Sequence, residues 1–342
     1  MSMITVYDRG GNAIAELKAS AARAWVLNEY GRATVELSLR EAAVKETFLQ
    51  FGNYLLIEHE TLGNWGGVID TPRVWQGGKV TVNAYSGEYL LGFRRGPLSK
   101  KMVGAAGVLY TQIIRMANSA EDLLIREGEI YTGGASVAQV VDVRPLYDAV
   151  CALAKQGGCD WSVTPARDSA GRLIFSANWY KQAGADRVLA LWEGQGGNVS
   201  LGDNPLVEQG VIINDLLGFG GGGLTWASRP RHNTIDEESA GRYGLRQGYE
   251  AYNGATNSGT IAESTKRAVE TEHEPRRTFN LRALDEGDTF ANLRLGDRVP
   301  LKLTSAGFMG GEIGMETVVR LVGMAHSDGD GAVELTCDEV TE

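Results

Sequence analysis

The sequence contains few cysteines and histidines, three and four respectively among 342 residues. Cys151, Cys159 and Cys337 form neither a paired framework nor a Cys-x-x-Cys spacing, which argues against disulfides and against a thiolate zinc site. None of the histidines stands in an HExxH or Cys/His ligand pattern. We therefore predict reduced, mostly buried thiols, with no metal site and no cofactor.

Long apolar runs and clusters of positive charge are also missing. No run approaches the roughly 18 apolar residues that cross a bilayer, and residues 1–10 lack a basic segment followed by an apolar one. The net charge of -10 argues against a surface that binds nucleic acid, because neutralising phosphates requires clustered Lys and Arg. We expect a soluble protein, made in the cytoplasm, without a membrane-spanning segment.

Catalytic signatures are a third absence. No GxSxG elbow or SxxK pair accompanies a positioned histidine. Grouped carboxylates could serve acid/base chemistry or sugar hydrolysis, but charged loop clusters of this kind are usually just solvated. The candidates are Glu127 with Glu129, and Asp285 with Glu286 and Asp288. The pattern favours a protein that is not an enzyme and has no catalytic residues.

Two glycine-bearing strings imitate ligand-binding motifs. Residues 218–223 satisfy GxGxxG after an apolar strand at Val211–Leu217, but residues 224–228 look like another strand where a nucleotide-binding turn needs a helix. We predict a flexible hairpin loop there. Asp328–Gly331 is similar to part of a calcium loop, but the required glutamate is not at the right spacing, so we predict a tight β-turn.

The chain does have length, abundant glycine and many short strands. Its 342 residues predict two or three units, and its 45 glycines exceed the average usage of roughly 7%. Alternation at Thr34–Leu39 places Val35, Leu37 and Leu39 on one face of a strand. Other predicted strands are Met3–Tyr7, Ile14–Leu17, Tyr54–Glu58, Gly67–Asp70 and Lys79–Tyr85. We predict a first β-domain, a sandwich or small barrel, at residues 1–97.

Helical patterns appear in the middle of the chain. Ala105–Asn118 carries apolar residues at helical spacing, and a second helix begins at Pro145 and stops at Gly157–Gly158. Predicted strands follow at Asp160–Val163, Leu173–Tyr180 and Arg187–Glu193. We predict an α/β insertion at residues 98–205, bounded by the polar turn Gly202–Pro205.

An internal repeat connects the two ends of the chain. Thr34–Leu37 and Leu49–Ile57 align without gaps on Thr278–Leu281 and Leu293–Leu301, since 278 − 34 and 293 − 49 both give 244. Glycine turns between apolar strands are common in β proteins, so a chance match is the alternative. The constant register favours a true repeat, because register preserves which side chains face the core.

The repeat extends to a turn and to a further strand. The turn residues are Gly52 and Asn53 in the first copy and Gly296 and Asp297 in the second. After a larger gap, residues 78–84 correspond to residues 331–337. We predict an α+β, mostly β fold, with two related β-barrel domains flanking the α/β insertion. The second barrel is predicted at residues 206–230 and 276–342.

Several strings along the chain carry a family resemblance. Residues 52–58 (GNYLLIE) and 62–70 (LGNWGGVID) resemble siphophage tail proteins related to the baseplate hub, also called tail-associated proteins. Tyr243–Arg246, a helix near Ile261–Thr271 and Leu295–Val299 resemble the second tube-forming half of such hubs. The resemblance spans most of the chain, and its motifs are structural strings without a catalytic signature.

The resemblance implies a structural hub protein of a phage or phage-like tail tip. In that family a homotrimer contributes two tube-type β-barrels per subunit, and the resulting pseudo-sixfold ring continues the tail tube and connects it to the baseplate or tip. The implied partners are the tail tube and distal tail proteins, tail-tip or fibre proteins, and DNA that crosses an acidic lumen without specific binding. The implied location is the virion, after synthesis in the host cytoplasm.

Residues 231–275 carry many charged, Gly, Asn and Ser residues and few large apolar ones before the predicted helix. A disordered linker is one interpretation. The other, favoured by the resemblance, is an inserted arm that becomes ordered only against neighbouring subunits. Arg242, Tyr243 and Arg246 are then predicted interface residues, because Arg and Tyr are enriched where surfaces become buried.

A carbohydrate-binding or adhesin module of a tail tip is the alternative function. It would present exposed indole rings to sugars, whereas a hub predicts buried ones. The candidate rings are Trp65, Trp75, Trp179 and Trp192. A cell-wall hydrolase would need an additional C-terminal catalytic domain, but the sequence ends at Glu342 directly after the last repeat strand.

Overall fold

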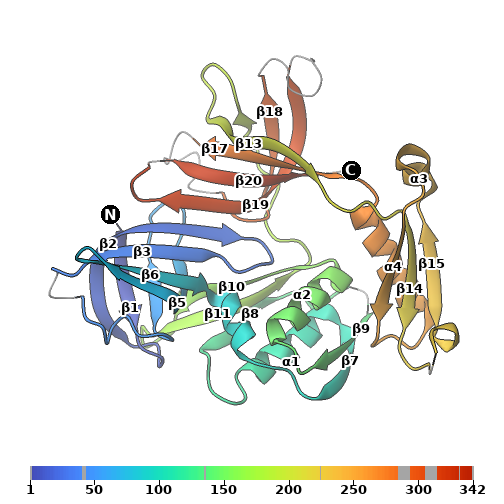
Figure 1. Cartoon of the computed structure of the whole chain (residues 1–342), viewed down its shortest axis with the longest axis horizontal. Coiled ribbons are helices and arrows are strands. Elements are labelled where there is room, and N and C mark those ends of the chain that lie inside the picture. The colour runs from blue at the N-terminus through green and yellow to red at the C-terminus, as the bar shows by residue number, and fades with distance from the viewer. Residues whose placement is uncertain are drawn as a thin grey trace.

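A computed structural model of the chain describes residues 2–40, 44–134, 136–223, 225–283, 293–304, 314–330 and 332–340. Figure 1 shows one strand-rich unit at the left, a second at the top, an α/β unit at the lower centre, and a small sheet with helices at the right. Most of the described elements are strands. The predicted fold class, mostly β with two related barrel units flanking an α/β insertion, is confirmed.

Six strands form a closed barrel in the first part of the chain. They are β1 (Ser2–Tyr7), β2 (Ala13–Val26), β3 (Arg32–Ser38), β4 (Tyr54–Ile57), β5 (Trp65–Gln76) and β6 (Lys79–Ser86). Their order is β1-β4-β5-β6-β3-β2, and β2 pairs with β1 to close the barrel. Val35 and Leu37 point inward and are buried, as their alternation predicts, whereas Leu39 lies beyond the end of β3 and is exposed.

A second set of strands repeats this order. It comprises β12 (Leu191–Trp192), β13 (Val199–Gln209), β17 (Arg276–Ala283), β18 (Arg298–Leu303), β19 (Met315–Ser327) and β20 (Val333–Glu339). The antiparallel path β4-β5-β6-β3-β2 recurs as β18-β19-β20-β17-β13. Strand β12 differs from β1, because it is short and pairs parallel with β18. The two units therefore share one topology, as the internal repeat predicts.

The β5–β6 and β19–β20 pairings have equivalent registers, whereas the β3–β6 and β17–β20 pairings do not. Ala84 faces Ile69 as Cys337 faces Leu321, which follows the sequence alignment of β6 with β20. On the other side Leu37 faces Val80, whereas its equivalent Leu281 faces Leu335 and not Val333. The alignment is thus wrong by two residues along β17. A two-residue slip keeps each side chain on the same face, so the core pattern survives it.

The α/β insertion packs against the first barrel. It contains β7 (Ser99–Ala105) paired with β9 (Ser136–Asp142), and the sheet β10-β11-β8, formed by Asp160–Arg167, Leu173–Tyr180 and Ile125–Ile130. Helices α1 (Ala106–Ala117) and α2 (Leu146–Gly157) and a 3-10 helix at Gly87–Phe93 cover these sheets. The predicted helices are confirmed, and α2 ends at Gly158, whose φ of 59° suits a glycine cap.

Two predictions near the end of the insertion need correction. The polar segment Gly202–Pro205 is not a turn between units, because it lies inside β13. There the pairing with β17 shifts between Leu201 and Leu206, and Asn204 adopts a φ of 48°. These features describe a bulge that lets one strand continue past polar residues. The strand predicted at Arg187–Glu193 is reduced to the two residues of β12.

A separate small unit, hereafter the arm, follows β13. It comprises the sheet β15-β14-β16, formed by Arg231–Ile235, Asp215–Gly220 and Gln247–Tyr252, with helices α3 (Glu237–Tyr243) and α4 (Ser258–Glu272). Strand β14 lies in the segment predicted for the second barrel, and α3 was not predicted. The strand predicted at residues 224–228 is wrong, because Trp226–Ser228 forms a 3-10 helix; Leu224 lies outside the described residues.

The arm is ordered against its own chain. Arg267 on α4 donates through Nη1 to the carbonyl of Gln156 at 2.6 Å, and Lys155 forms an ion pair with Glu272 at 3.1 Å. A small apolar cluster formed by Ala138, Tyr252, Ala255 and Ile261 lies at the same contact. The expectations of a disordered linker, and of order only against other subunits, are therefore both wrong. These polar and apolar contacts join the arm to α2 and β9 of the insertion.

Candidate functional site

One strand pair joins the two barrels edge to edge. Ala22–Val26 of β2 pair antiparallel with Gly323–Ser327 of β19. We call this pairing the joint. It continues the sheet from the first barrel into the second without interruption, and Figure 1 shows the two barrels meeting there. Each barrel can therefore offer the outer edge of one strand to a neighbouring barrel.

A buried ion pair secures the joint. The Arg23 guanidinium donates through Nη1 to Asp328 Oδ1 at 3.3 Å and to Ser2 Oγ at 3.0 Å. The Asp328 carboxylate also accepts from the backbone N–H of Ser2 at 2.6 Å and of Ala21 at 3.2 Å. Burial raises the pKa of Asp328, but these hydrogen bonds and the Arg23 charge outweigh it, so the pKa lies below its usual value.

The sequence analysis did not identify Arg23. For Asp328 it predicted the turn but not the buried ion pair. The predicted tight turn at Asp328–Gly331 is confirmed for residues 328–330; Gly331 lies outside the described residues. A signal for Arg23 existed, because it occupies an inward position in the alternation Ala19, Ala21, Arg23. A cation in such a position predicts a buried anion opposite it.

Asp160 connects three units at a second node. Its Oδ1 accepts from Asn28 of the first barrel at 2.8 Å, and its Oδ2 accepts from the Ala183 N–H at 2.6 Å. The same carboxylate forms an ion pair with Arg320 on β19 of the second barrel. Asn28 in turn accepts from the Trp161 N–H at 2.8 Å, which fixes the start of β10. One carboxylate thus ties the insertion to both barrels.

A cavity of about 470 Å³ lies at this three-way junction. Its walls include the rings of Trp25, Trp65 and Trp161, one from each of β2, β5 and β10. Glu88 also lines it, and burial raises the pKa of this carboxyl. Its oxygens accept from Ser86 and from the backbone of Val163, so it links the insertion to the first barrel. The cavity belongs to the packing between units.

The four predicted repeat-turn residues lie in two equivalent turns, one in each barrel. Gly52 and Gly296 have φ values of 88° and 90°. The Gly52 N–H donates to the Ile69 carbonyl at 3.0 Å, and the Gly296 N–H donates to the Leu321 carbonyl at 2.7 Å. Each turn therefore fastens the connection before β4 or β18 to the adjacent long strand. Positive φ at this position favours glycine in both copies.

The residues after the turn glycines have different side-chain roles. Asn53 donates through Nδ2 to the Phe48 carbonyl at 3.0 Å and stabilises its own loop. Asp297 is buried, accepts from the Ala185 N–H at 2.8 Å, and forms an ion pair with Arg187 at 2.7 Å. Asp297 thus holds the segment that leads from the insertion into the second barrel.

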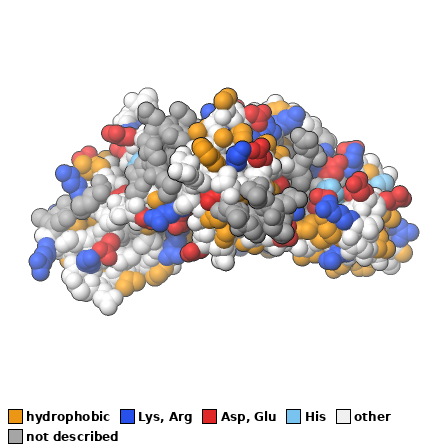
Figure 2. Space-filling view, turned by 90° about the horizontal axis from the view of Figure 1, so that it is seen from above, with side chains coloured by type: hydrophobic (Ala, Val, Ile, Leu, Met, Phe, Trp, Pro, Cys, Tyr) orange, Lys and Arg blue, Asp and Glu red, His pale blue; other side chains and the backbone are white. Residues whose placement is uncertain are grey.

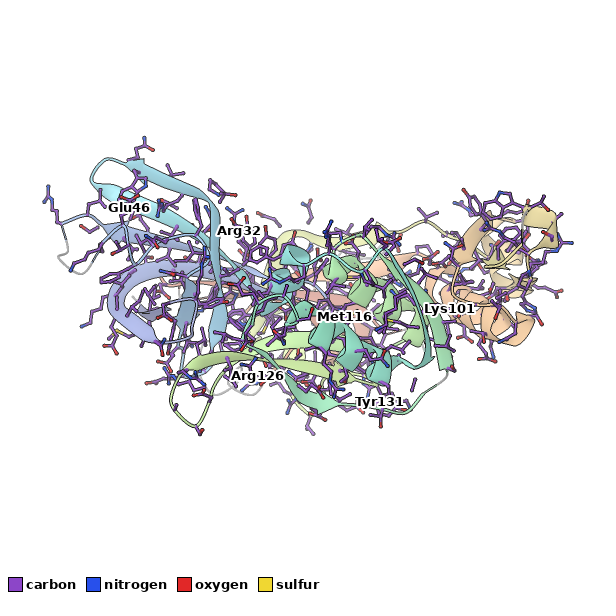
Figure 3. All side chains as sticks on the ribbon, turned by 90° about the horizontal axis from the view of Figure 1, so that it is seen from below. Arg32, Glu46, Lys101, Met116, Arg126 and Tyr131 are labelled. Atoms are coloured by element: carbon purple, nitrogen blue, oxygen red, sulfur yellow. The ribbon has the colours of Figure 1, made fainter. Side chains whose placement is uncertain are left out.

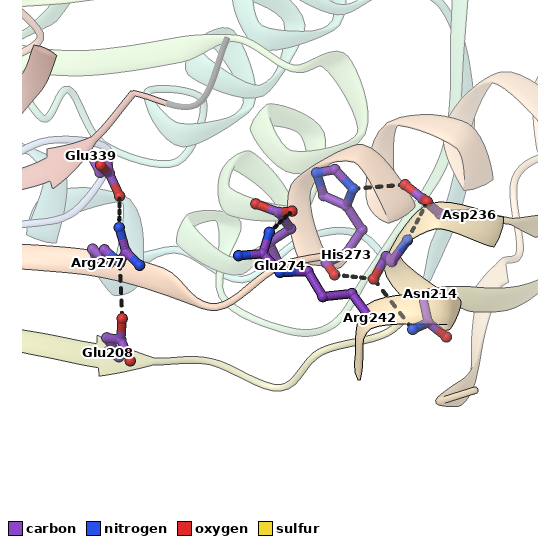
Figure 4. Close-up of polar contacts among 9 residues, drawn as sticks. Glu208, Asn214, Asp236, Arg242, His273, Glu274, Arg277 and Glu339 are labelled. Atoms are coloured by element: carbon purple, nitrogen blue, oxygen red, sulfur yellow. Dashed lines mark hydrogen bonds and ion pairs between the residues drawn. The ribbon is translucent and has the colours of Figure 1, made fainter. Parts of the chain in front are cut away.

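The predicted interface residues lie together at the end of α3 in the arm. Arg242 forms an ion pair with Glu274 at 3.3 Å (Figure 4). It also stacks on the Tyr243 ring with 5.1 Å to its centroid. Arg246 donates through Nε to the Tyr243 carbonyl at 3.3 Å, and its backbone N–H donates to Asn214 at 2.8 Å. The side chains of Arg242 and Arg246 are exposed, and their contact with another subunit stays a prediction.

The four candidate tryptophans divide into two groups. Trp65 and Trp179 are 1% and 0% exposed, so neither can stack on a sugar. Trp75 and Trp192 are 44% and 41% exposed and stand on different barrels. The two exposed rings therefore come from β5 and β12, one strand in each barrel.

The glycines of the GxGxxG string serve packing. Gly218 and Gly220 lie within β14, where a Cβ would come within 2.3 Å of Thr265 Oγ1 and 2.5 Å of the Ala255 carbonyl. They let α4 approach the sheet closely. Of the candidate carboxylates, Glu127 forms an exposed ion pair with Arg115. Asp285, Glu286 and Asp288 lie outside the described residues.

Two further kinds of site are absent from the described parts of the chain. These parts contain no group of three or more His, Cys, Asp or Glu side chains that could hold a metal ion. No helix among them is long and apolar enough to cross a membrane. All three cysteines are present as free thiols, two of them buried and Cys151 half-buried.

No family model matches the chain, and no curated protein matches it. Solved structures do match along nearly its whole length. The prophage tail protein gp18 from Listeria monocytogenes is 13% identical, with a TM-score of 0.61, and the match covers 98% of this chain and 94% of that one. The prophage MuSo2 43 kDa tail protein from Shewanella oneidensis is 12% identical, with a TM-score of 0.60 and coverage of 99% and 98%.

A third match comes from a secretion system. The E. coli c3393 protein is a component of the type VI secretion system, described as similar in structure to the T4 bacteriophage tail proteins gp27 and gp5. It is 12% identical, with a TM-score of 0.53, and the match covers 100% of this chain and 75% of that one. At these identities the matches establish the fold. This chain has the fold of prophage tail proteins, as its sequence resemblance predicts.

Proposed function

We propose that this chain is a structural subunit of a phage or phage-like tail, placed at the hub where the tail tube meets the tip. The fold it shares with prophage tail proteins supports a tail role over nearly its full length. The single observation that carries the hub assignment is the pair of topologically equivalent barrels joined through β2 and β19.

A duplicated barrel suits a subunit that connects a sixfold tube to a threefold tip. Three copies of a chain with two similar barrels present six similar barrels around an axis, so a trimer can match a sixfold tube on one side and a threefold tip on the other. The joint supplies the side-by-side arrangement that such a ring needs within each subunit. The bent outline of the molecule in Figure 2 is also compatible with one segment of a ring.

The remaining parts of the proposal concern partners. The ring would contact the tail tube on one face and tail-tip or fibre proteins on the other, within the virion. The net charge of -10 supports passage of DNA through the ring without adhesion, because like charges repel the phosphates. The arm would supply contacts to neighbouring tail proteins through Arg242, Tyr243 and Arg246. The role is structural and not catalytic.

The solution mass of the purified chain, measured by light scattering with negative-stain images of the same sample, tests this proposal. A trimeric ring with a central hole and sixfold-like features is the expected result. A compact monomer at every concentration, without a hole, would contradict ring formation by the chain itself. Glycan binding by that monomer would then support the carbohydrate-binding alternative.

A further inference from the structure

The internal repeat identifies the second-barrel counterpart of the joint strand β2. On β2, Arg23 faces Ala33 of β3. Ala33 faces Ala84 of β6, whose equivalent on β20 is Cys337. Cys337 faces Phe279 of β17, and Phe279 faces Leu206 of β13. Leu206 is therefore the structural equivalent of Arg23, and residues 205–209 are the equivalents of Ala22–Val26.

The first-barrel counterpart of β19 follows in the same way. On β19, His326 faces Val333 of β20. On β5, Trp75 faces Val80 of β6, and Val80 is the sequence equivalent of Val333. Trp75 is therefore the equivalent of His326. The second half of β5, residues 72–76, corresponds to the β19 segment that forms the joint.

Both counterparts have an open edge. In the described part of the chain β13 pairs only with β17, apart from one bridge at Val199, so the other edge of residues 206–209 has no partner strand. Strand β4 covers only Trp65–Val68 of β5, and among the described strands none pairs with that edge further along. Open edges of this kind are templates for pairing with another chain.

We propose that these two edges pair between copies: the end of β13 in one subunit adds to the second half of β5 in the next, repeating the joint. The inference rests on the proposed ring and specifies its subunit interface. Arg23 faces His326 in the joint, so Leu206 faces Trp75 of the next copy. The antiparallel register then places Val207 opposite Val74 and Glu208 opposite Arg73.

Exposed apolar side chains mark both edges. Val74 and Trp75 on β5 are 46% and 44% exposed, and Val211 after β13 is 76% exposed. In the proposed register Val74 and Val211 lie on the same face of the new strand pair, because residues two apart share a face. Pairing would remove these apolar groups from water, which supplies a driving force for association.

Charge is complementary on the opposite face. Arg73 stacks between Phe51 and Trp75, with 5.1 and 5.4 Å to their ring centroids, and Phe51 is 42% exposed. Glu208 is the acidic residue of the β13 edge, where it pairs with Arg277 at 2.8 Å. The register places Arg73 directly opposite Glu208 of the next copy, an arrangement that stabilises strand pairs.

The two edges face different neighbours. Glu46, which forms an ion pair with Arg73, lies at the end of the molecule away from the arm (Figure 3). Strand β13 leads from the second barrel toward the arm (Figure 1). Contacts between two different surfaces of identical chains are head-to-tail contacts, and these close into a ring when the rotation permits.

Cysteine pairs test this interface. In the chain with Val74→Cys and Val207→Cys, mild oxidation should give covalent species that increase in size up to the trimer. The matched control combines Val74→Cys with Glu208→Cys, which moves one cysteine to the other face of its strand. We expect about tenfold less cross-linked product from this control. Ala24→Cys with Ala325→Cys, the equivalent pair within one chain, should close an intramolecular disulfide under the same conditions.

Light scattering of the reduced variants separates the possible outcomes. A trimer that cross-links through the cysteines introduced at positions 74 and 207, at the level expected, supports the interface. A trimer with no more product than the off-register control overturns the interface and leaves the proposed ring intact. A monomer without cross-links at any concentration contradicts the ring itself, and the inference falls with it. The unsubstituted chain gives the background from Cys151, Cys159 and Cys337.

Discussion

Arg23 and Asp328 form an ion pair across the joint, with 3.3 Å between Nη1 and Oδ1 and side chains 0% and 5% exposed. Removing the anion leaves a guanidinium buried with less compensating charge. We expect Asp328→Asn to lower the free energy of unfolding by about 3 kcal/mol. Urea unfolding followed by circular dichroism measures this loss.

The same turn offers a matched control. Asp330 forms an ion pair with Arg282, and both side chains are nearly half exposed, so solvent screens the pair. Asp330→Asn should cost less than about 1 kcal/mol. Equal losses of unfolding free energy in the two variants would show that the buried pair stabilises the protein no more than the exposed pair does.

The pH dependence of stability should report the Asp328 carboxylate. Its pKa is lowered in the folded protein, so its contribution is present above the pKa of the unfolded chain, about 3.9, and is lost as pH falls through the folded value. The stability difference between the wild type and Asp328→Asn should be constant from about pH 5 to 7 and shrink below about pH 4. A difference that persists unchanged to about pH 3 would contradict this assignment.

The two repeat turns should differ in their tolerance of alanine. Both glycines have positive φ, but a Cβ on Gly296 would lie 2.5 Å from the Ala183 carbonyl, whereas a Cβ on Gly52 would meet the Arg9 side chain at 2.8 Å. A flexible side chain can move and backbone cannot. We expect losses of about 3 kcal/mol for Gly296→Ala and about 1 to 2 for Gly52→Ala. Gly329→Ala, which meets open space, should change stability by less than about 0.5 kcal/mol in the same denaturation assay.

Two glycines of the arm should also respond differently to substitution by alanine. A Cβ on Gly218 would lie 2.3 Å from Thr265 Oγ1 on α4, so Gly218→Ala should push α4 away from its sheet. Faster hydrogen exchange of α4 amides, with unchanged exchange in the first barrel, is the expected result. Gly241 lies in α3 and faces open space, so Gly241→Ala should slow exchange in α3 through its better helix propensity. Unchanged exchange in both variants would argue against a packing role for Gly218.

Local patterns predicted the elements that depend on nearby residues. Val35 and Leu37 alternate with polar neighbours, and that period is enough to place β3 and its buried face. The repeat offset of 244 placed Gly52 and Gly296 in equivalent turns, because glycine at positive φ has a strong local preference. Helices α1 and α2 were found from apolar spacing, and the end of α2 from its glycine stop signal, whereas α4 was expected from the family resemblance.

Predictions failed where a strand partner decides the outcome. Gly202–Pro205 has the composition of a turn, yet β17 holds it within β13 as a bulge. Trp226–Ser228 has the residues of a strand but finds no partner and forms a 3-10 helix. The arm looked too polar for a core, yet it is ordered because α4 packs on α2.

The sequence by itself determined the duplication, the alternation of the barrel strands and the positions of the turn glycines, since each is written in the spacing of a few neighbouring residues. Only the tertiary structure decided which strands meet. The joint pairs residue 23 with residue 326, and Asp160 reaches Asn28 and Arg320. Contacts between residues so far apart depend on how whole barrels pack, and no local period in the chain specifies that arrangement.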